Sequence, residues 1–384
     1  MRLPLRKVTF KRYHSRRKNP MTATHNAPPL LVVDDALFDE HRPRGYHPER
    51  PERLQAARSA LDRCASEGLQ TQKIDSRDAT DEELAHVHDI AYIESLAPLA
   101  GHYASLDPDT YLAPLSVAAA RRAAGSSIAL VDGLLARTPS GANDGATRQP
   151  STGLALLRPP GHHATRSRGM GFCLFNNVAV AAAHALNKGL SRVAIVDWDV
   201  HHGNGTQDIF WSDPRVLYMS LHQFPFYPGT GSLQETGGAD APGHSVNVPL
   251  SAGAGDAVYT EAFRRIVTPI LDEFAPELVL ISAGFDAHRR DPLAEMCVTD
   301  EGYAIMATAM TQIALRHAQG RIGFFLEGGY DLTALSSSLA SVLLASVATV
   351  SADSLMPSFA PMSFRHEDEL TRARKAAATH WRGI

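Results

Sequence analysis

Cysteine is scarce in this chain: its 384 residues include only three, Cys64, Cys173 and Cys297. They are odd in number and form no CxxC motif. The sequence therefore predicts neither a disulfide framework nor a zinc site built from cysteines. Unpaired thiols are typical of a reducing compartment, so we expect a cytoplasmic location.

No apolar run predicts a membrane span, because residues 332–350 are apolar but carry several serines and Thr349. Acidic residues are absent from residues 1–20, which hold eight of the 37 lysines and arginines. The remaining 29 basic residues face 41 acidic ones, a net charge of −12. We therefore expect no membrane or direct nucleic-acid partner, and an attraction for cations such as lysine side chains and polyamines.

The basic start lacks the apolar stretch of a secretory signal, and Met21 opens a segment that looks like an ordinary amino terminus. We interpret residues 1–28 as an extension outside the fold. A basic targeting or nucleic-acid-binding arm is the alternative for its first 20 residues. Residues 29–384 are expected to form one domain, with a flexible loop at 138–150 and a charged tail, helical or disordered, at 365–384.

Apolar strand candidates alternate with helical patterns along this body. Strands are predicted at residues 30–33, 153–157, 192–197, 216–221, 278–282 and 322–326, and helices at 80–96, 114–137, 176–188, 257–274, 299–319 and 332–350. The alternation predicts a single α/β domain with a doubly wound, mostly parallel sheet and helices on both faces. A capping box at Thr80–Glu83 opens the first of these helices, which predicts that His86 and His88 lie on its surface.

The strand at 192–197 runs directly into residue types that bind metals. Alternate side chains of an extended segment share a face, so Asp197, Asp199 and His201 begin on one side. A carboxylate and an imidazole suit a divalent ion such as zinc, with a third ligand from elsewhere in the chain. The alternative for this triplet alone is a solvated strand end with one buried ion pair.

The histidine pair His162–His163 favours the catalytic interpretation, because it follows a Pro-Pro-Gly turn that fixes the backbone. Six motifs occur in order along the chain: RPPGHHA (158–164), GFCLFNN (171–177), DWDVHHGNGTQ (197–207), FYPGTG (226–231), SAGFDAHRRDPL (282–293) and LEGGY (326–330). From about residue 30 to about residue 350 the chain thus resembles the zinc-dependent histone deacetylases of the arginase/deacetylase superfamily. Asn204 and Glu327 resemble the class II and bacterial amidohydrolase branch.

The resemblance implies one catalytic Zn²⁺ held by Asp199, His201 and Asp286, with an open position for water and substrate. Zinc would activate water to attack an amide. The family also implies that His163 acts first as a base and later as an acid, with Asn204 as its partner. His162 lies beside it and has Asp197 as its partner. Tyr330 is implied as the hydrogen-bond donor to the oxyanion.

The resemblance also implies binding residues. Those for the substrate are Gly171, Phe172, Tyr227, Leu293 and Gly328, where the two aromatic residues form the walls of a narrow tunnel and Leu293 lies at its mouth. Monovalent cation sites, for structural K⁺, would use Asp197, Asp199, His201, Ser220 and Leu221, and a second group Phe210, Asp213 and Val216.

The expected activity is hydrolysis of the amide of acyl-lysine side chains in peptides or proteins. One alternative is an acetylpolyamine amidohydrolase, and another is a catalytically silent acyl-lysine binding module. Tyr330 and both histidines argue against the silent module. A two-manganese ureohydrolase is disfavoured because no DAHxD repeat supplies carboxylates for a second metal. A homo-oligomer is left open by the sequence.

Overall fold

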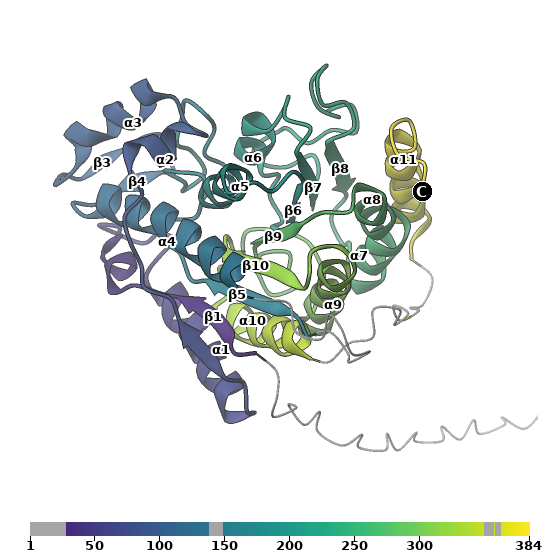
Figure 1. Cartoon of the computed structure of the whole chain (residues 1–384), viewed down its shortest axis with the longest axis horizontal. Coiled ribbons are helices and arrows are strands. Elements are labelled where there is room, and N and C mark those ends of the chain that lie inside the picture. Colours follow the sequence, from purple (N-terminus) through teal and green to yellow (C-terminus); the bar gives the residue numbers. More distant parts are fainter. Residues whose placement is uncertain (1–27, 138–148, 349–356, 358–361) are drawn as a thin grey trace, which may run out of the picture.

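The computed structural model describes residues 28–137, 149–348, 357 and 362–384 (Figure 1). The expected amino-terminal extension and the loop expected at 138–150 fall almost entirely outside these ranges. No helix within them is long and apolar enough to cross a membrane.

A single parallel sheet forms the centre of the described chain. Its eight strands lie in the order β2-β1-β5-β10-β9-β6-β7-β8, and every neighbouring pair is parallel. The strands are β1 Leu30–Val33, β2 Thr71–Lys73, β5 Ser151–Ala155, β6 Val193–Asp197, β7 Val216–Gln223, β8 Ser245–Leu250, β9 Leu278–Ala283 and β10 Arg321–Leu326; a small antiparallel pair is formed by β3 Ala104–Ser105 and β4 Tyr111–Leu112.

Helices cover both faces of this sheet. They are α1 Glu52–Ser66, α2 Asp81–Ala85, α3 Ile90–Leu96, α4 Ser116–Ala136, α5 Asn177–Asn187, α6 Asn204–Ile209, α7 Asp256–Ala262, α8 Thr268–Phe274, α9 Asp300–His317, α10 Leu332–Val347 and α11 Phe364–Ala377; short 3-10 turns lie at Ala36–Glu40 and Ala97–Leu99, and a π turn at Phe263–Val267 joins α7 to α8. On one side of the sheet α1, α10 and α9 pack together, and α4 packs with α5 on the other (Figure 1). The predicted fold class is therefore confirmed.

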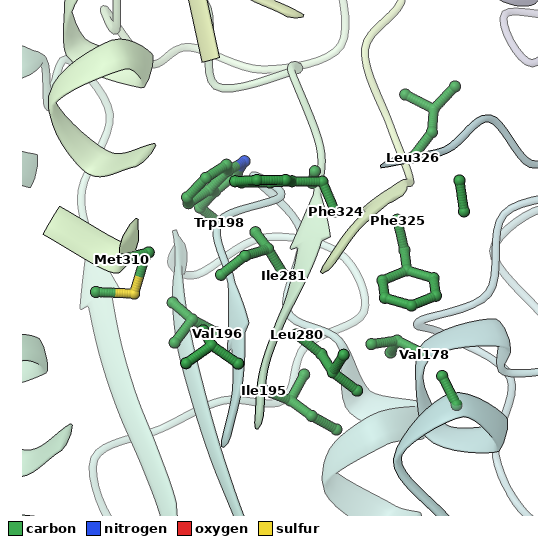
Figure 2. Close-up of a cluster of buried hydrophobic side chains, with 14 of the residues drawn as sticks. Val178, Ile195, Val196, Trp198, Leu280, Ile281, Met310, Phe324, Phe325 and Leu326 are labelled. Carbon is green, nitrogen blue, oxygen red and sulfur yellow. The ribbon is translucent and has the colours of Figure 1, made fainter. Parts of the chain in front are cut away.

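The central strands are apolar at successive positions because both of their faces are covered. Side chains alternate between the faces with a period of two, so Ile281 and Phe324 point toward the Met310 side and Leu280 and Phe325 toward the Val178 side (Figure 2). All of these side chains are buried. The double covering explains why β6, β9 and β10 were recognisable from the sequence as continuous apolar runs.

The helix predicted at 80–96 is two helices, and the prediction for His88 is wrong. The Thr80 capping box does open α2, but α2 ends at Ala85 and α3 begins at Ile90. His88 lies between them and is buried. Its Nδ1 hydrogen-bonds to the carbonyl of Thr165 and its Nε2 accepts from the backbone N–H of Asn176, so it braces the segment after β5.

The carboxyl-terminal residues complete one edge of the sheet. The region expected to be helical or disordered contains α11, which packs over the edge strand β8. After α11, the indole N–H of Trp381 donates to the carbonyl of Gly243 at 2.9 Å. Strand β8 was not predicted, because its sequence SVNVPL mixes polar and apolar residues and includes Pro249, which suits an edge strand.

Candidate metal centre and active site

The loops that follow four neighbouring strands carry the expected metal ligands, the histidine pair and Tyr330. The order β5, β10, β9, β6 places the loops that follow these strands side by side. His162 and His163 follow β5, Asp199 follows β6, Asp286 follows β9 and Tyr330 follows β10. Parallel strands present their carboxyl ends at one edge, so residues distant in the sequence meet there.

Asp199, His201 and Asp286 bring one ligand atom each to a common point. Nδ1 of His201 lies 3.2 Å from Oδ1 of Asp199 and 3.2 Å from Oδ2 of Asp286. Ligand atoms bound to one tetrahedral zinc ion lie about 3.3 Å apart, given bonds of about 2.0 Å. Both distances from Nδ1 match this spacing, and all three ligand atoms lie within 4.8 Å of one another.

The electrostatics of this group also favour a bound cation. Both carboxylates are buried, and in the part of the chain that the structure describes neither pairs with a lysine or arginine. Burial opposes a charge on His201, but Asp199 and Asp286 raise the pKa of its imidazole to about 10. Burial and the charge of Asp199 also raise the pKa of Asp286. A divalent cation would offset this buried negative charge, so the residues present fit a metal.

Backbone amides and two glycines hold the carboxylates in place. Val200 N–H donates to Oδ1 of Asp286 at 2.9 Å, and Gly328 N–H donates to Oδ2 of Asp199 at 2.8 Å. A Cβ on Gly284 would lie 2.1 Å from Oδ2 of Asp199, and one on Gly328 would lie 2.1 Å from Oδ2 of Asp286. Only glycine leaves room for these carboxylates, which explains the glycines of AGFD and EGG.

The two histidines have different partners. Nδ1 of His162 lies 3.0 Å from Oδ2 of Asp197, which also accepts the hydroxyl of Tyr218 at 3.1 Å. Nδ1 of His163 lies 2.8 Å from Oδ1 of Asn204. One ring is thus held by a carboxylate and the other by a neutral amide. The ring centroids lie 4.0 Å apart.

These partners separate the pKa values of the pair. Burial opposes protonation of His162, but Asp199 and Asp197 hold its pKa well above the usual value. Burial, followed by the charges of His162 and His201, holds the pKa of His163 well below it. A neutral His163 that donates its Nδ1–H to the amide keeps a free lone pair on Nε2, as a general base requires.

Aromatic side chains lie around the histidine pair and the candidate metal ligands. The ring of Tyr227 meets those of His163 and His201 edge-on, with centroids 5.2 and 6.1 Å apart. The ring of Phe172 meets that of Tyr330 edge-on at 6.0 Å. Burial raises the pKa of Tyr330 well above its usual value, so its phenol stays protonated and can donate a hydrogen bond.

The other two expected substrate residues lie on adjoining segments. Gly171 has a φ of 56°, and a Cβ there would lie 2.5 Å from Cδ2 of His163. The backbone N–H of Leu293 donates to Oδ1 of Asp291, whose Oδ2 accepts from the N–H of Tyr330 at 2.6 Å. Asp291 therefore ties the segment of Leu293 to that of Tyr330.

The residues expected to bind monovalent cations lie near β6 and β7. Asp197 pairs with Ser220 across the two strands, and the Ser220 hydroxyl contacts Nδ1 of His222 at 2.9 Å. The residues of the second expected site lie on two consecutive turns, in which Asp213 N–H donates to the Phe210 carbonyl and Val216 N–H to the Asp213 carbonyl. Potassium binding at either place stays a prediction.

Sequence reasoning missed a buried charged cluster beside the site. Arg53 donates to the backbone carbonyls of Gly329, at 2.7 Å, and Glu327, and its guanidinium lies 5.1 Å from the centroid of the Tyr330 ring. Glu49 pairs with Arg53 and with Arg158. The charged residues of the HPERPERL segment (47–54) could have indicated such a cluster, but the residues that they contact lie far away in the sequence.

This chain has the arginase/deacetylase-like α/β fold. Its candidate metal centre and histidine pair lie at the carboxyl ends of the parallel strands. The sequence profile of the histone deacetylase domain matches residues 47–346. The chain belongs to the histone deacetylase family, and it is a hydrolase of the deacetylase type.

Individual relatives agree with this assignment. Histone deacetylase 14 of Arabidopsis thaliana, a chloroplastic protein, is 39% identical over 306 residues, which cover 78% of this chain and 70% of the relative. The human polyamine deacetylase HDAC10 is 39% identical over 358 residues, which cover 88% of this chain and 50% of that protein. A crystal structure of the HDA15 HD domain has a TM-score of 0.82 and 36% identity, and the match covers 93% of this chain and 97% of that one.

Proposed function

We propose that the chain is a zinc-dependent amidohydrolase that removes acyl groups from lysine side chains. The convergence of the ligand atoms of Asp199, His201 and Asp286 beside a neutral His163 supports this proposal. A bound zinc ion would polarise the acyl carbonyl and lower the pKa of a water molecule.

The residues of the chain would supply the remaining chemistry. Nε2 of His163 accepts the proton of the attacking water and later returns it to the leaving amine. His162, held by Asp197, keeps a positive charge beside it. The Tyr330 hydroxyl donates to the oxygen that gains negative charge as the carbonyl is attacked, a contribution of about 10²- to 10³-fold in rate for comparable donors.

Phe172 and Tyr227 suit the aliphatic stem of an acyl-lysine, because they present ring faces and edges rather than charges. Leu293 adds an apolar side chain at the position where the resemblance places a glutamate in polyamine-selective relatives. An apolar residue there offers no partner to a free ammonium group.

Acetylated polyamines are the second candidate, and two observations favour them. HDAC10, which is 39% identical, carries the name of a polyamine deacetylase. In addition, Asp109 and Asp107 lie close enough to Tyr227 to add to the effect of burial in raising its pKa. These carboxylates would attract a cationic amine.

Two measurements test the proposal together. Metal analysis should find one zinc per chain in the wild type and a loss of zinc and activity in Asp286→Ala, because Asp286 is one of only three ligands in the group that the described residues form. Turnover should be measured on peptides with acetyl- and longer acyl-lysines and on acetylated polyamines. Full zinc occupancy and normal turnover in Asp286→Ala would contradict the metal assignment, and binding without turnover would favour the silent module.

A further inference from the structure

The imidazole of His201 is the one ring among the three candidate metal ligands of the described chain. A metal-ligating histidine ordinarily donates its second ring N–H to a carboxylate, a carbonyl or water. Nδ1 of His201 faces Asp199 and Asp286, whereas no residue in the described ranges hydrogen-bonds to its Nε2. The contacts that the described residues make beyond Nδ1 are contacts with neighbouring rings.

Phe226 makes one of these contacts by stacking. Its ring centroid lies 5.5 Å from that of His201, with an angle of 21° between the planes. Tyr227, the next residue, meets the same imidazole edge-on at 6.1 Å and 78°. One ring face and one ring edge thus confine the imidazole, and rotation of His201 about its Cβ–Cγ bond would break both contacts.

The segment that carries these two rings is anchored by one carboxylate. Glu235 accepts the backbone N–H groups of Gly231, at 3.0 Å, and Ser232, at 2.9 Å. It also accepts the side-chain N–H of Gln207 at 2.7 Å. Although burial opposes it, these hydrogen bonds hold the pKa of Glu235 below its usual value, so the anchor is charged at neutral pH.

A second chain of hydrogen bonds links the segment to the residue next to the metal ligand. Thr230 Oγ1 lies 2.7 Å from Nδ1 of His202, and Nε2 of His202 lies 3.2 Å from Oε1 of Gln207. A neutral imidazole satisfies both contacts, since it accepts from the threonine and donates to the amide. Gly231 fits closely against the rings of His222 and His202, because a Cβ there would lie 2.4 Å from Nε2 of His222 and 2.7 Å from Cδ2 of His202.

We propose that Phe226 is a positioning residue for the metal ligand His201, and that Glu235 keeps Phe226 in place. The stacked ring limits rotation of the imidazole about its Cβ–Cγ bond. Gln207, the last residue of the DWDVHHGNGTQ motif, joins the ligand loop to the anchor. The inference rests on the proposed metal site.

The test is zinc retention, measured by competition with a chelator in the purified full-length protein. Phe226→Leu keeps an apolar side chain but removes the stacked ring, and we expect it to bind zinc about tenfold more weakly, the smaller of the losses typical for an outer-shell partner. Phe226→Tyr keeps the ring and should retain zinc like the wild type. Phe224→Leu is the matched control, because Phe224 contacts the ring of His222 instead of His201.

The anchor is tested in the same assay. Glu235→Ala should lower zinc affinity, as Phe226→Leu does. The zinc affinity of the double variant should be no lower than that of the more affected single variant, because both changes free the same ring. Gln234→Ala, at the exposed neighbouring position, is the control. The visible absorption of the cobalt-substituted proteins adds a readout of ligand geometry, which should change in Phe226→Leu and not in Phe224→Leu.

The outcomes separate the two proposals. A wild type that holds no metal would contradict the proposed function itself. A wild type that binds zinc, with Phe226→Leu of equal affinity and an unchanged cobalt spectrum, would overturn the positioning role and leave the proposed function intact. Equal weakening in Phe226→Leu and Phe224→Leu would show general loosening of the segment and would also overturn it.

Discussion

Gly328 donates its backbone N–H to Oδ2 of Asp199 at 2.8 Å, and the same residue has no room for a side chain beside Asp286. The loop that carries Tyr330 therefore also contacts two of the three candidate metal ligands. Each carboxylate is held by a backbone N–H, Asp199 by that of Gly328 and Asp286 by that of Val200. The metal centre and the tyrosine are thus built as one unit.

Gly328→Ala should consequently lose metal. The added Cβ would lie 2.1 Å from Oδ2 of Asp286 and 2.6 Å from Oδ2 of Asp199, which is closer than atoms can approach. We expect zinc affinity to fall about tenfold or more, as for loss of an outer-shell contact. Zinc content after dialysis against a weak chelator measures this. Gly45→Ala is the control, since no atom lies within 4 Å of its added methyl group, and a normal zinc content in Gly328→Ala would contradict the argument.

Tyr330→Phe should separate catalysis from binding. The variant keeps the ring that meets Phe172 but lacks the donor. If the hydroxyl acts only in the transition state, kcat falls by about 10²- to 10³-fold while KM and zinc content stay near wild type. Steady-state kinetics on an acetyl-lysine peptide give both constants. Tyr103→Phe, at a half-exposed tyrosine, is the control. A wild-type kcat in Tyr330→Phe would contradict the oxyanion role of this hydroxyl.

The sequence predicted the central strands because strands covered on both faces are continuous apolar runs, and polar motifs follow several of these strands directly. The third metal ligand, Asp286, came from the resemblance to the family. The pairing of His162 with Asp197 and of His163 with Asn204 is the pairing that the resemblance implied.

Long-range packing was not predictable in this way. His88 is polar and follows a capping box, so its burial depends on the helix break after Ala85 and on contacts with residues far along the chain. The ion pair of Glu49 and Arg158 joins residues 109 positions apart. Nothing local in either segment indicates the other partner. The stacking of Phe226 on His201 is hidden for the same reason.

The buried ion pair of Glu49 and Arg158 predicts a large loss of stability when one partner is neutralised. Both side chains are fully buried, and Glu49 also pairs with Arg53. Glu49→Gln leaves two buried arginines without their counter-charge, so we expect a loss of about 3 kcal/mol or more in the free energy of unfolding at pH 7. Urea unfolding measures it. Glu83→Gln, which changes a partly exposed pair with Arg77, should cost less than about 1 kcal/mol.

The same pair predicts the sign of a pH dependence. Burial raises the pKa of Glu49, but the charge and hydrogen bonds of Arg158 outweigh it and hold the pKa well below the ordinary value of 4.5. A carboxyl group with a depressed pKa in the folded state stabilises the fold above its unfolded pKa, and this contribution is lost as the pH falls below that value. The stability difference between wild type and Glu49→Gln should therefore be constant above about pH 5 and shrink in more acidic solution. A difference that does not change with pH would show that the charge of Glu49 is not what stabilises the cluster.

The apolar side chain of Leu293 leads us to expect a preference for acyl-lysine over polyamine substrates. A polyamine keeps a cationic amine beyond the amide, and a carboxylate at the entrance would stabilise it where the attraction is least screened. Leu293 offers an apolar side chain on the segment that Asp291 ties to Tyr330. We therefore expect the wild type to have a higher kcat/KM on an acetyl-lysine peptide than on N-acetylated putrescine or spermidine.

Leu293→Glu should shift this ratio toward the polyamines, whereas Leu293→Gln, of the same size but without the charge, should not. Asp107 and Asp109 work against the expectation, because they already place negative charge near Tyr227. Their effect is common to both variants, so the comparison of Glu with Gln isolates the charge at position 293. A shift that weakens as salt is added would identify it as electrostatic. If the wild type instead prefers the polyamines by tenfold or more, about 1.4 kcal/mol of transition-state discrimination, the carboxylates near Tyr227 dominate and the acyl-lysine assignment is wrong.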